Sequence, residues 1–235
     1  MNTITFVGAG PGAADLITVR GQKALQNAQV VLFDALLDGG LLAYCAADVI
    51  LVDVGKRCSK NNAKPQDEIN ALLIEHGLKY ARTVRLKGGD PSIFGRLDEE
   101  ITAARQAGLA VEVVPGVTAA LAAAAAAQTP LTKRGVTRSV RFLTATVGTA
   151  QPENDWDNAL DPSETMIFYM SGKQLREIGL RLLFGGFSAA TPVMIVRGAS
   201  WTNQDCQRLV LADLPEWVLS ESDAPCLLMV GLALS

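Results

Sequence analysis

Short apolar runs alternate with amphipathic segments along the chain, and this alternation limits the possible folds more than any other feature. The runs of the first half end at Gly, Pro or Asp, as buried strands do, and lie at 3–7, 30–33, 49–52, 83–87 and 111–114. Helical patterns separate them at 18–27, 66–76 and 98–107. Strands that alternate with helices are typical of a parallel sheet with crossover connections. The sequence therefore predicts an α/β fold.

The second half repeats this arrangement after a break at Pro115 and Gly116. An alanine-rich segment, 119–128, predicts a closely packed helix. Further strand patterns follow at 139–144, 165–169, 191–196, 207–211 and 226–230. The later patterns lie closer together, which indicates that part of this sheet is antiparallel. We expect two α/β domains, 1–114 and 115–235, with a cleft between them.

Composition narrows the class of ligand. The net charge of -3 gives no general attraction for nucleic acid or an anionic membrane surface. The four cysteines form no C-x-x-C pair, and His76 is the single histidine, so we expect no metal. The chain shows neither a leader pattern nor an apolar run of about 18 residues. We expect a cytoplasmic protein with a small-molecule ligand, without a nucleic-acid or membrane partner.

The first candidate motif is G-A-G-P-G at 8–12, where glycines permit a tight turn close to a ligand. Gly8, Gly10 and Ala13 also fit a dinucleotide-binding pattern, with Asp34 as the acidic ribose ligand. A nicotinamide-dependent oxidoreductase is therefore one interpretation, and an ordinary strand-to-helix turn is another. Against the first, the helical pattern begins only near Thr18, too late for a phosphate-binding helix.

Two further motifs gather glycine, hydroxyl and carboxylate groups. The segment 85–96 reads R-L-K-G-G-D-P-S-I-F-G-R, with two adjacent glycines on which a ligand can rest and a carboxylate at Asp90. The segment 114–120 reads V-P-G-V-T-A-A and offers a hydroxyl at a helix start. Helix capping by Asp90 and Thr118 is the alternative interpretation of both motifs.

Together these motifs resemble the tetrapyrrole (corrin/porphyrin) methylase family. The similarity extends over nearly the whole chain and includes D-L-I-T from Asp15, V-G-K-R from Val54, F-Y-M from Phe168 and G-A-S-W-T-N-Q from Gly198. It implies two α/β domains with S-adenosylmethionine in the cleft between them, which is the class III methyltransferase fold, and a homodimer. The implied cofactor contacts are Pro11, Gly88, Gly89, Asp90, Ile93, Thr118, Ala119, Met170 and Gly198.

Within the family, the chain is most similar to the enzymes that methylate uroporphyrinogen III at C2 and C7. The resemblance implies formation of precorrin-2 for sirohaem or cobalamin biosynthesis, with S-adenosylhomocysteine as the other product. It assigns acid-base roles to Asp34 and Lys56 and a role as base or substrate anchor to Arg96. We favour anchoring for Arg96, because a guanidinium stays protonated.

Several loops depart from the family pattern. The chain reads L-T-A-T at 143–146 where the family typically has a Thr-Gly-His element. A methylase of another precorrin and a cofactor-binding protein without activity are therefore further interpretations. The short segment after Gly231 leads us to expect no attached dehydrogenase-ferrochelatase domain.

Overall fold

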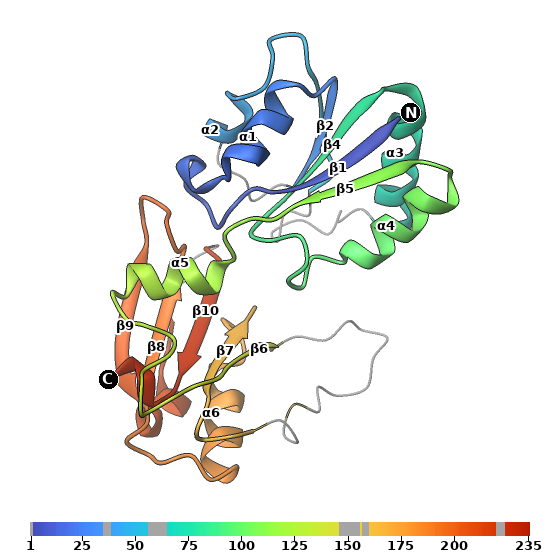
Figure 1. The fold of residues 1–235 in the computed structure, drawn as a ribbon. Helices are drawn as coiled ribbons and strands as arrows, with labels where there is room; N and C mark the ends of the chain where they lie inside the picture. The colour runs from blue at the N-terminus through green and yellow to red at the C-terminus, as the bar shows by residue number, and fades with distance from the viewer. Residues whose placement is uncertain (1, 35–38, 56–64, 146–155, 157–159, 220–223) are drawn as a thin grey trace. The chain divides into compact units, whose positions relative to one another are not determined.

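The computed structural model describes residues 2–34, 39–55, 65–145, 156, 160–219 and 224–235. The chain divides into two compact units, Met1–Ala119 and Ala120–Ser235, each with its own five-stranded sheet (Figure 1). This confirms the predicted α/β fold class with two sheets. The domain ranges 1–114 and 115–235 stay a prediction.

The sheet of the first unit is wholly parallel, in the order β3-β2-β4-β1-β5. Its strands are β1 (Thr3–Gly8), β2 (Val30–Phe33), β3 (Ile50–Asp53), β4 (Arg82–Lys87) and β5 (Ala110–Val114). The helices are α1 (Val19–Gln26), α2 (Gly39–Leu42), α3 (Gln66–Lys79) and α4 (Leu97–Gln106), with a short 3-10 helix at Ala14–Leu16. Each predicted strand and helix of this half is confirmed to within one to three residues at its ends.

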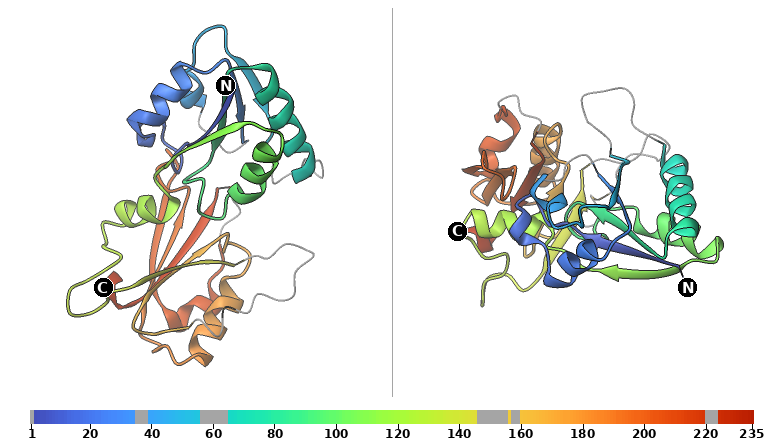
Figure 2. Two further views of the ribbon diagram at one scale, coloured as in Figure 1. Left: turned by 45° about the vertical axis from the view of Figure 1, so that its right-hand side comes forward. Right: turned by 90° about the horizontal axis from the view of Figure 1, so that it is seen from above.

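Helices cover both faces of this sheet, as a parallel sheet requires. One apolar cluster joins Leu25 of α1 and Leu41 of α2 to Val7 and Val31 of the strands. The opposite face carries a second cluster, in which α3 and α4 pack against β1 and β2. The views in Figure 2 show the same two layers of helix around the sheet.

The sheet of the second unit has the order β6-β7-β10-β8-β9. Its strands are β6 (Val140–Thr144), β7 (Thr165–Tyr169), β8 (Pro192–Arg197), β9 (Asp205–Val210) and β10 (Cys226–Val230). Only β6 and β7 pair in parallel, whereas β10 runs antiparallel to both neighbours and β9 runs antiparallel to β8. The expectation of a partly antiparallel sheet is therefore confirmed.

Helices of the second unit include the alanine-rich α5 (Ala119–Ala126) and the helix α6 (Leu175–Phe184). Helix α5 confirms the predicted segment, although it ends two residues early, before Gln128 at a φ of 51°. Helix α6 is absent from the sequence-based prediction. Its buried side chains pack against β7, β8 and β10 in one apolar cluster with Trp156. No helix in the described ranges is long and apolar enough to span a membrane.

Candidate active site

The strand order of the first unit indicates where a ligand would bind at the carboxyl edge of its sheet. Strands β1 and β4 are neighbours, but β1 continues toward α1 on one face while β4 continues toward α4 on the other. In open α/β sheets, ligands bind at the carboxyl ends of two such strands, because the diverging connections leave the edge open. The glycine motifs that follow β1 and β4 lie at this place.

Three loops meet there with their backbones in close contact, at what we call the glycine junction (Gly8–Gly10, Gly88–Asp90 and Gly116). A Cβ atom built on Gly8 would lie 2.5 Å from the Cα of Gly116 and 2.8 Å from the carbonyl oxygen of Gly89. One built on Gly116 would lie 2.2 Å from that same oxygen. Side chains are therefore excluded where these loops cross.

Main-chain hydrogen bonds join the loops after β1 and β4. The amide of Gly89 donates to the carbonyl of Gly10 at 2.7 Å, and the amide of Gly10 donates to the carbonyl of Gly89 at 3.2 Å. The amide of Ala9 donates to the carbonyl of Lys87 at 2.8 Å. Gly10 and Gly89 have φ angles of 82° and 65°, which glycine adopts without the penalty that other residues incur. The two loops therefore form one unit.

Asp90 ties the third loop to this unit. Its Oδ2 accepts a hydrogen bond from the amide of Gly116 at 2.9 Å, and its Oδ1 accepts from the amide of Ser92 at 2.8 Å and from the Ser92 hydroxyl. Helix α4 begins only at Leu97, so the alternative of helix capping by Asp90 is wrong. Asp90 instead closes a turn and bridges two loops.

The electrostatics of Asp90 follow from these contacts. Partial burial raises the pKa of the carboxyl, but hydrogen bonds from the Ser92 side chain, the Gly116 amide and the Ser92 amide outweigh it. The pKa of Asp90 therefore lies below its ordinary value. A carboxylate with a depressed pKa stabilises the fold at pH values above its unfolded pKa, and this stabilisation is lost as the pH falls through the folded pKa.

We therefore expect Asp90→Asn to lower the free energy of unfolding most above about pH 4, and progressively less at lower pH. Urea unfolding across this pH range measures the difference from the unmodified chain. Asp48→Asn is the matched control, since Asp48 lies exposed in a loop. A difference for Asp90→Asn that stays constant down to the acid limit would contradict the role of its charge.

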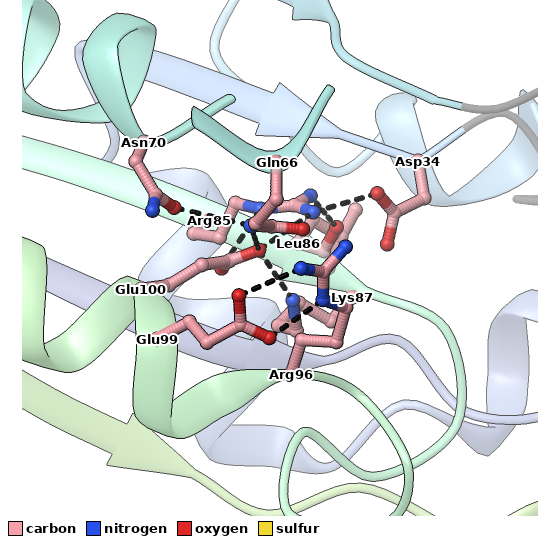
Figure 3. Close-up of polar contacts among 9 residues, drawn as sticks. All are labelled: Asp34, Gln66, Asn70, Arg85, Leu86, Lys87, Arg96, Glu99 and Glu100. Atoms are coloured by element: carbon pink, nitrogen blue, oxygen red, sulfur yellow. Dashed lines mark hydrogen bonds and ion pairs between the residues drawn. The ribbon is translucent and has the colours of Figure 1, made fainter. Parts of the chain in front are cut away.

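A buried ion network lies beside the glycine junction, at the end of β4 (Figure 3). The side chain of Arg85 is 2% exposed, and that of Glu100 is 1% exposed. The Nε of Arg85 donates to Oε2 of Glu100 at 3.2 Å, and the Nζ of Lys87 donates to Oε1 of Glu100 at 2.7 Å. Gln66 of α3 also donates to this Oε1, at 3.3 Å. We call Arg85, Lys87 and Glu100 the buried trio.

The electrostatics of Lys87 reflect its neighbours within the trio. Burial lowers the pKa of Lys87, and the positive charge of Arg85 lowers it further. The carboxylate of Glu100 acts in the opposite direction but does not restore the ordinary value. Arg85 and Lys87 both contact the one buried carboxylate of Glu100.

Asp34, a predicted acid-base residue, lies where this network reaches the surface. It follows β2, and its Oδ1 accepts a hydrogen bond from Nη2 of Arg85 at 2.7 Å. The side chain of Asp34 is 32% exposed, unlike the trio behind it. Asp34 is thus held from the interior while part of its side chain is exposed to solvent.

Arg96, the predicted anchor, precedes α4 with a φ of 54°. Its Nε and Nη2 donate to the two carboxylate oxygens of Glu99, each at 2.6 Å. This hydrogen-bonded pair raises the pKa of Arg96 above its ordinary value. The Arg96 guanidinium therefore stays protonated.

The structure brings several of the predicted cofactor contacts together in the first unit. Gly88, Gly89 and Asp90 form part of the glycine junction, and Pro11 follows Gly10 directly. A Cβ atom built on Gly89 would lie 3.9 Å from the Cα of Thr118 and 4.0 Å from the amide nitrogen of Ala119. Ile93 donates its amide to the Asp90 carbonyl at 3.2 Å. Lys56 lies outside the described residues.

The remaining two predicted contacts lie at one edge of the sheet of the second unit. Met170 follows β7 and Gly198 follows β8, and these strands flank the start of β10. Both residues have positive φ angles, 56° and 55°. The amide of Gly198 donates to the carbonyl of Pro225, just before β10, at 2.9 Å. The second unit therefore presents both residues on turns at the same edge.

Six further basic residues lie near the family motifs and are candidates to bind substrate carboxylates: Arg57, Lys60, Lys133, Arg134, Arg138 and Arg141. Two of them have partners within the chain. Arg141 donates to Glu164 at 2.6 Å, and Lys133 donates to the carbonyl of Ser235 at 3.3 Å. Arg134 and Arg138 are exposed on the loop before β6. Arg57 and Lys60 lie outside the described residues. Within the described ranges, no three His, Cys, Asp or Glu side chains gather as a metal site requires.

Comparison with known proteins supports one family. Residues 3–215 match the family model described as Tetrapyrrole (Corrin/Porphyrin) Methylases. The siroheme synthase of Pseudomonas entomophila (strain L48) is 41% identical over 229 residues, which is 97% of this chain and 49% of that protein. The siroheme synthase of Psychrobacter arcticus is 42% identical over 98% of this chain and 42% of its own length. The chain spans about half the length of these curated relatives.

Solved structures agree with this result. The uroporphyrin III C-methyltransferase of Thermus thermophilus has a TM-score of 0.84 and 32% identity, and the alignment covers 98% of both chains. The same Thermus enzyme is also known in complex with S-adenosylhomocysteine. A cobalt precorrin-4 methyltransferase has a TM-score of 0.85 and 28% identity, over 99% of this chain and 96% of that one. The chain therefore belongs to the tetrapyrrole (corrin/porphyrin) methylase family.

Proposed function

We propose that this chain transfers methyl groups from S-adenosylmethionine to C2 and C7 of uroporphyrinogen III, giving precorrin-2. The observation that carries the proposal is the glycine junction, a backbone surface at the switch point of the first sheet, built from the family's motifs. The similarity to the Thermus uroporphyrin III C-methyltransferase supports the choice of substrate. We further propose that the enzyme acts as a homodimer.

The residues of the junction suit a ligand with both charged and hydroxyl groups. When bound, S-adenosylmethionine supplies an electrophilic methyl group on a sulfonium. Gly88 has open space where a Cβ atom would project, so a ligand can approach its main chain closely. Asp90 keeps acceptor capacity beyond its bonds to Ser92 and Gly116, since a carboxylate offers about four lone-pair sites. Thr118 and Ala119 would provide further contacts at the start of α5.

Methylation of a pyrrole carbon also requires charge control and removal of one proton. We assign acid-base work to Asp34 and Lys56, and assign to Arg96 a contact with a substrate carboxylate. Uroporphyrinogen III carries eight carboxylates, and a guanidinium binds such groups with two parallel hydrogen bonds. Glu99 occupies Nε and one hydrogen of Nη2, so a substrate carboxylate would bind Arg96 at the edge formed by Nη1 and Nη2.

A nicotinamide-dependent function fits the strand order less well. In the dinucleotide-binding fold, β2 lies beside β1, so that its terminal acid reaches the ribose. Here β4 lies between β1 and β2, and Asp34 binds Arg85. Helix α1 begins only at Val19, with Thr18 as its N-cap, after the intervening 3-10 helix. No helix therefore starts directly at the G-A-G-P-G turn, where pyrophosphate would bind.

The second candidate is methylation of another precorrin. The specific observation in its favour is the TM-score of 0.85 with a cobalt precorrin-4 methyltransferase, against 0.84 with the Thermus uroporphyrin III C-methyltransferase. The sequence at 143–146, which departs from the family pattern, also bears on the acceptor. This candidate shares the cofactor and the glycine junction with the first, and differs only in the tetrapyrrole.

Anaerobic incubation of the purified protein with S-adenosylmethionine and uroporphyrinogen III tests the proposal. Mass spectrometry of the oxidised products counts the methyl groups added. We expect two, at C2 and C7. Absence of transfer, with S-adenosylhomocysteine still bound in calorimetry, would reject uroporphyrinogen III and favour another precorrin. Absence of both would reject the methylase proposal, and binding of NAD in its place would support the oxidoreductase.

Gly88→Ala separates ligand contact from fold stability. Because nothing lies within 4 Å of the added methyl group, we expect the free energy of unfolding to change by less than about 0.5 kcal/mol. We expect the affinity for S-adenosylhomocysteine to fall at least about tenfold, since the methyl group would occupy the space of the ligand. Urea unfolding and calorimetry measure the two effects. Unchanged affinity would remove Gly88 from the cofactor site.

A further inference from the structure

We propose that Arg85 is a positioning residue for methyl transfer, which acts by holding Asp34, and that Glu100 fixes Arg85 for this purpose. The inference rests on the proposed function, because it assigns Arg85 a role through a proposed acid-base residue. Its starting point is the charge of the buried trio. Arg85 and Lys87 carry two positive charges against the single negative charge of Glu100.

The surplus positive charge is directed at one residue. Asp34 contacts the trio through Arg85 and supplies the second carboxylate, which makes the group of four neutral. Three members lie in the interior, whereas the Asp34 side chain is 32% exposed. Both interior cations attract Asp34 through a medium with little water, where charges interact more strongly than at the surface. The network therefore fixes the carboxylate of a partly exposed side chain.

The geometry of the Arg85 guanidinium explains how Glu100 fixes the orientation of the hydrogen bond to Asp34. Its Nε and Nη2 donate to the two oxygens of Glu100, at 3.2 and 3.3 Å, and its Nη1 donates to the carbonyl of Leu86 at 3.1 Å. A planar group held at three nitrogens cannot rotate. The remaining hydrogen of Nη2 then points at Oδ1 of Asp34. The carboxylate of Glu100 thus sets the direction from which Asp34 is held (Figure 3).

Glu100 is itself held by three side chains from two elements. Its Oε1 accepts hydrogen bonds from Lys87 of β4, from Arg85 of the same strand and from Gln66 of α3. Gln66 in turn donates to Asn70 at 3.1 Å. Buried ion clusters of this kind contribute little net stability relative to apolar packing, because removing each charge from water is costly. A positional role accounts for the network where a stability role does not.

A double-mutant cycle tests this inference, with Asp34→Asn and Arg85→Met alone and combined. A residue that acts through Asp34 has nothing to position once the carboxylate is gone. We expect Arg85→Met to lower kcat by about 10- to 100-fold, as misplacement of a reacting group does. We expect the same change to have little effect on kcat in the Asp34→Asn background. Losses that multiply in the double variant would overturn the inference.

Further variants separate positioning from general damage. Arg85→Lys keeps a cation beside Glu100 but lacks the planar fork of donors, so it cannot be locked against Glu100 while it points a further donor at Asp34. We expect its kcat to fall as in Arg85→Met, while its affinity for S-adenosylhomocysteine stays within about twofold of the unmodified chain. Arg176→Met is the control, because Arg176 forms an exposed pair with Glu216. A parallel loss of cofactor affinity in the Arg85 variants would overturn the positional role.

A crystal structure of Arg85→Lys distinguishes failure of this inference from failure of the proposed function. If the unmodified protein methylates no tetrapyrrole, the proposed function fails, but the position of Asp34 can still be measured. We expect its carboxylate to move by about 1 Å, which is enough to affect a reacting group. An Asp34 carboxylate that stays in place would overturn the inference. So would full methylation activity of Asp34→Asn.

Discussion

Gly116→Ala is expected to unfold the first unit or to destabilise it by about 3 kcal/mol or more. The added Cβ atom would lie 2.2 Å from the carbonyl oxygen of Gly89 and 2.8 Å from the Cα of Gly8. Both neighbours are backbone atoms of hydrogen-bonded loops, so neither yields as a flexible side chain would. If the variant folds, separation of the loops is expected to abolish binding of S-adenosylhomocysteine. Urea unfolding and calorimetry measure the two losses.

Gly39→Ala is the matched control for this substitution. A Cβ atom built on Gly39, at the start of α2, would meet nothing within 4 Å. We expect the free energy of unfolding to stay the same or to rise by up to about 1 kcal/mol, as it does when alanine replaces glycine in a helix. Equal stabilities of Gly39→Ala and Gly116→Ala would show that the loops do not cross as described.

Glu100→Ala is expected to cost about 3–5 kcal/mol, because it leaves Arg85 and Lys87 buried without their shared counter-ion. Neither cation can reach water without disturbing β4, whose residues from Thr83 to Lys87 are all buried. Chemical denaturation measures the effect. Methyl transfer is expected to be lost as well, since the contact between Arg85 and Asp34 depends on Glu100.

Glu99→Ala is the matched control, because it removes a neighbouring glutamate of the same helix that is exposed and not buried. Glu99 precedes Glu100 in the first turn of α4, so loss of a negative charge near the helix start is common to both variants. Its pair with Arg96 is exposed, at 46% for Arg96 and 42% for Glu99, and such pairs contribute about 0–1 kcal/mol. A cost for Glu99→Ala as large as that for Glu100→Ala would contradict the importance of burial.

The elements of the fold could be predicted because their signals are local. The run at 30–33 is apolar on both faces, as a central parallel strand requires, and β2 has these bounds. The position of β4 between β1 and β2 could not be predicted, since strand order depends on contacts distant in sequence. Helix α6 was missed because its segment, with L-R-E-I-G-L-R, carries a glycine at its centre, which weakens a helical pattern.

The candidate site was predictable by motif and only partly by physical reasoning. The glycines indicate the junction. Two adjacent glycines such as Gly88-Gly89 lose more conformational entropy on folding than other residues, so they are expected where the backbone must turn tightly or approach another group closely. The buried trio was missed, since Glu99 and Glu100 are alike in composition and only the fold decides which is buried. One signal was available. Arg85 and Lys87 are two residues apart and so lie on the same face of their strand. A strand in a parallel sheet is covered on both faces, and two buried cations require a buried anion.

The loops after β1 and β4 are joined by peptide groups, and this limits what mutagenesis can reveal there. Alanine scanning works by deleting side chains, yet Gly8, Gly10 and Gly89 have none to delete. A scan can only add atoms at these positions. The measured loss of stability then reflects steric clashes and not the energy of the native contacts. Replacing the amide of Gly89 by an ester would instead remove one donor and leave the shape unchanged. Chemical synthesis of the backbone, and not the genetic code, is the means to measure what this part of the protein contributes.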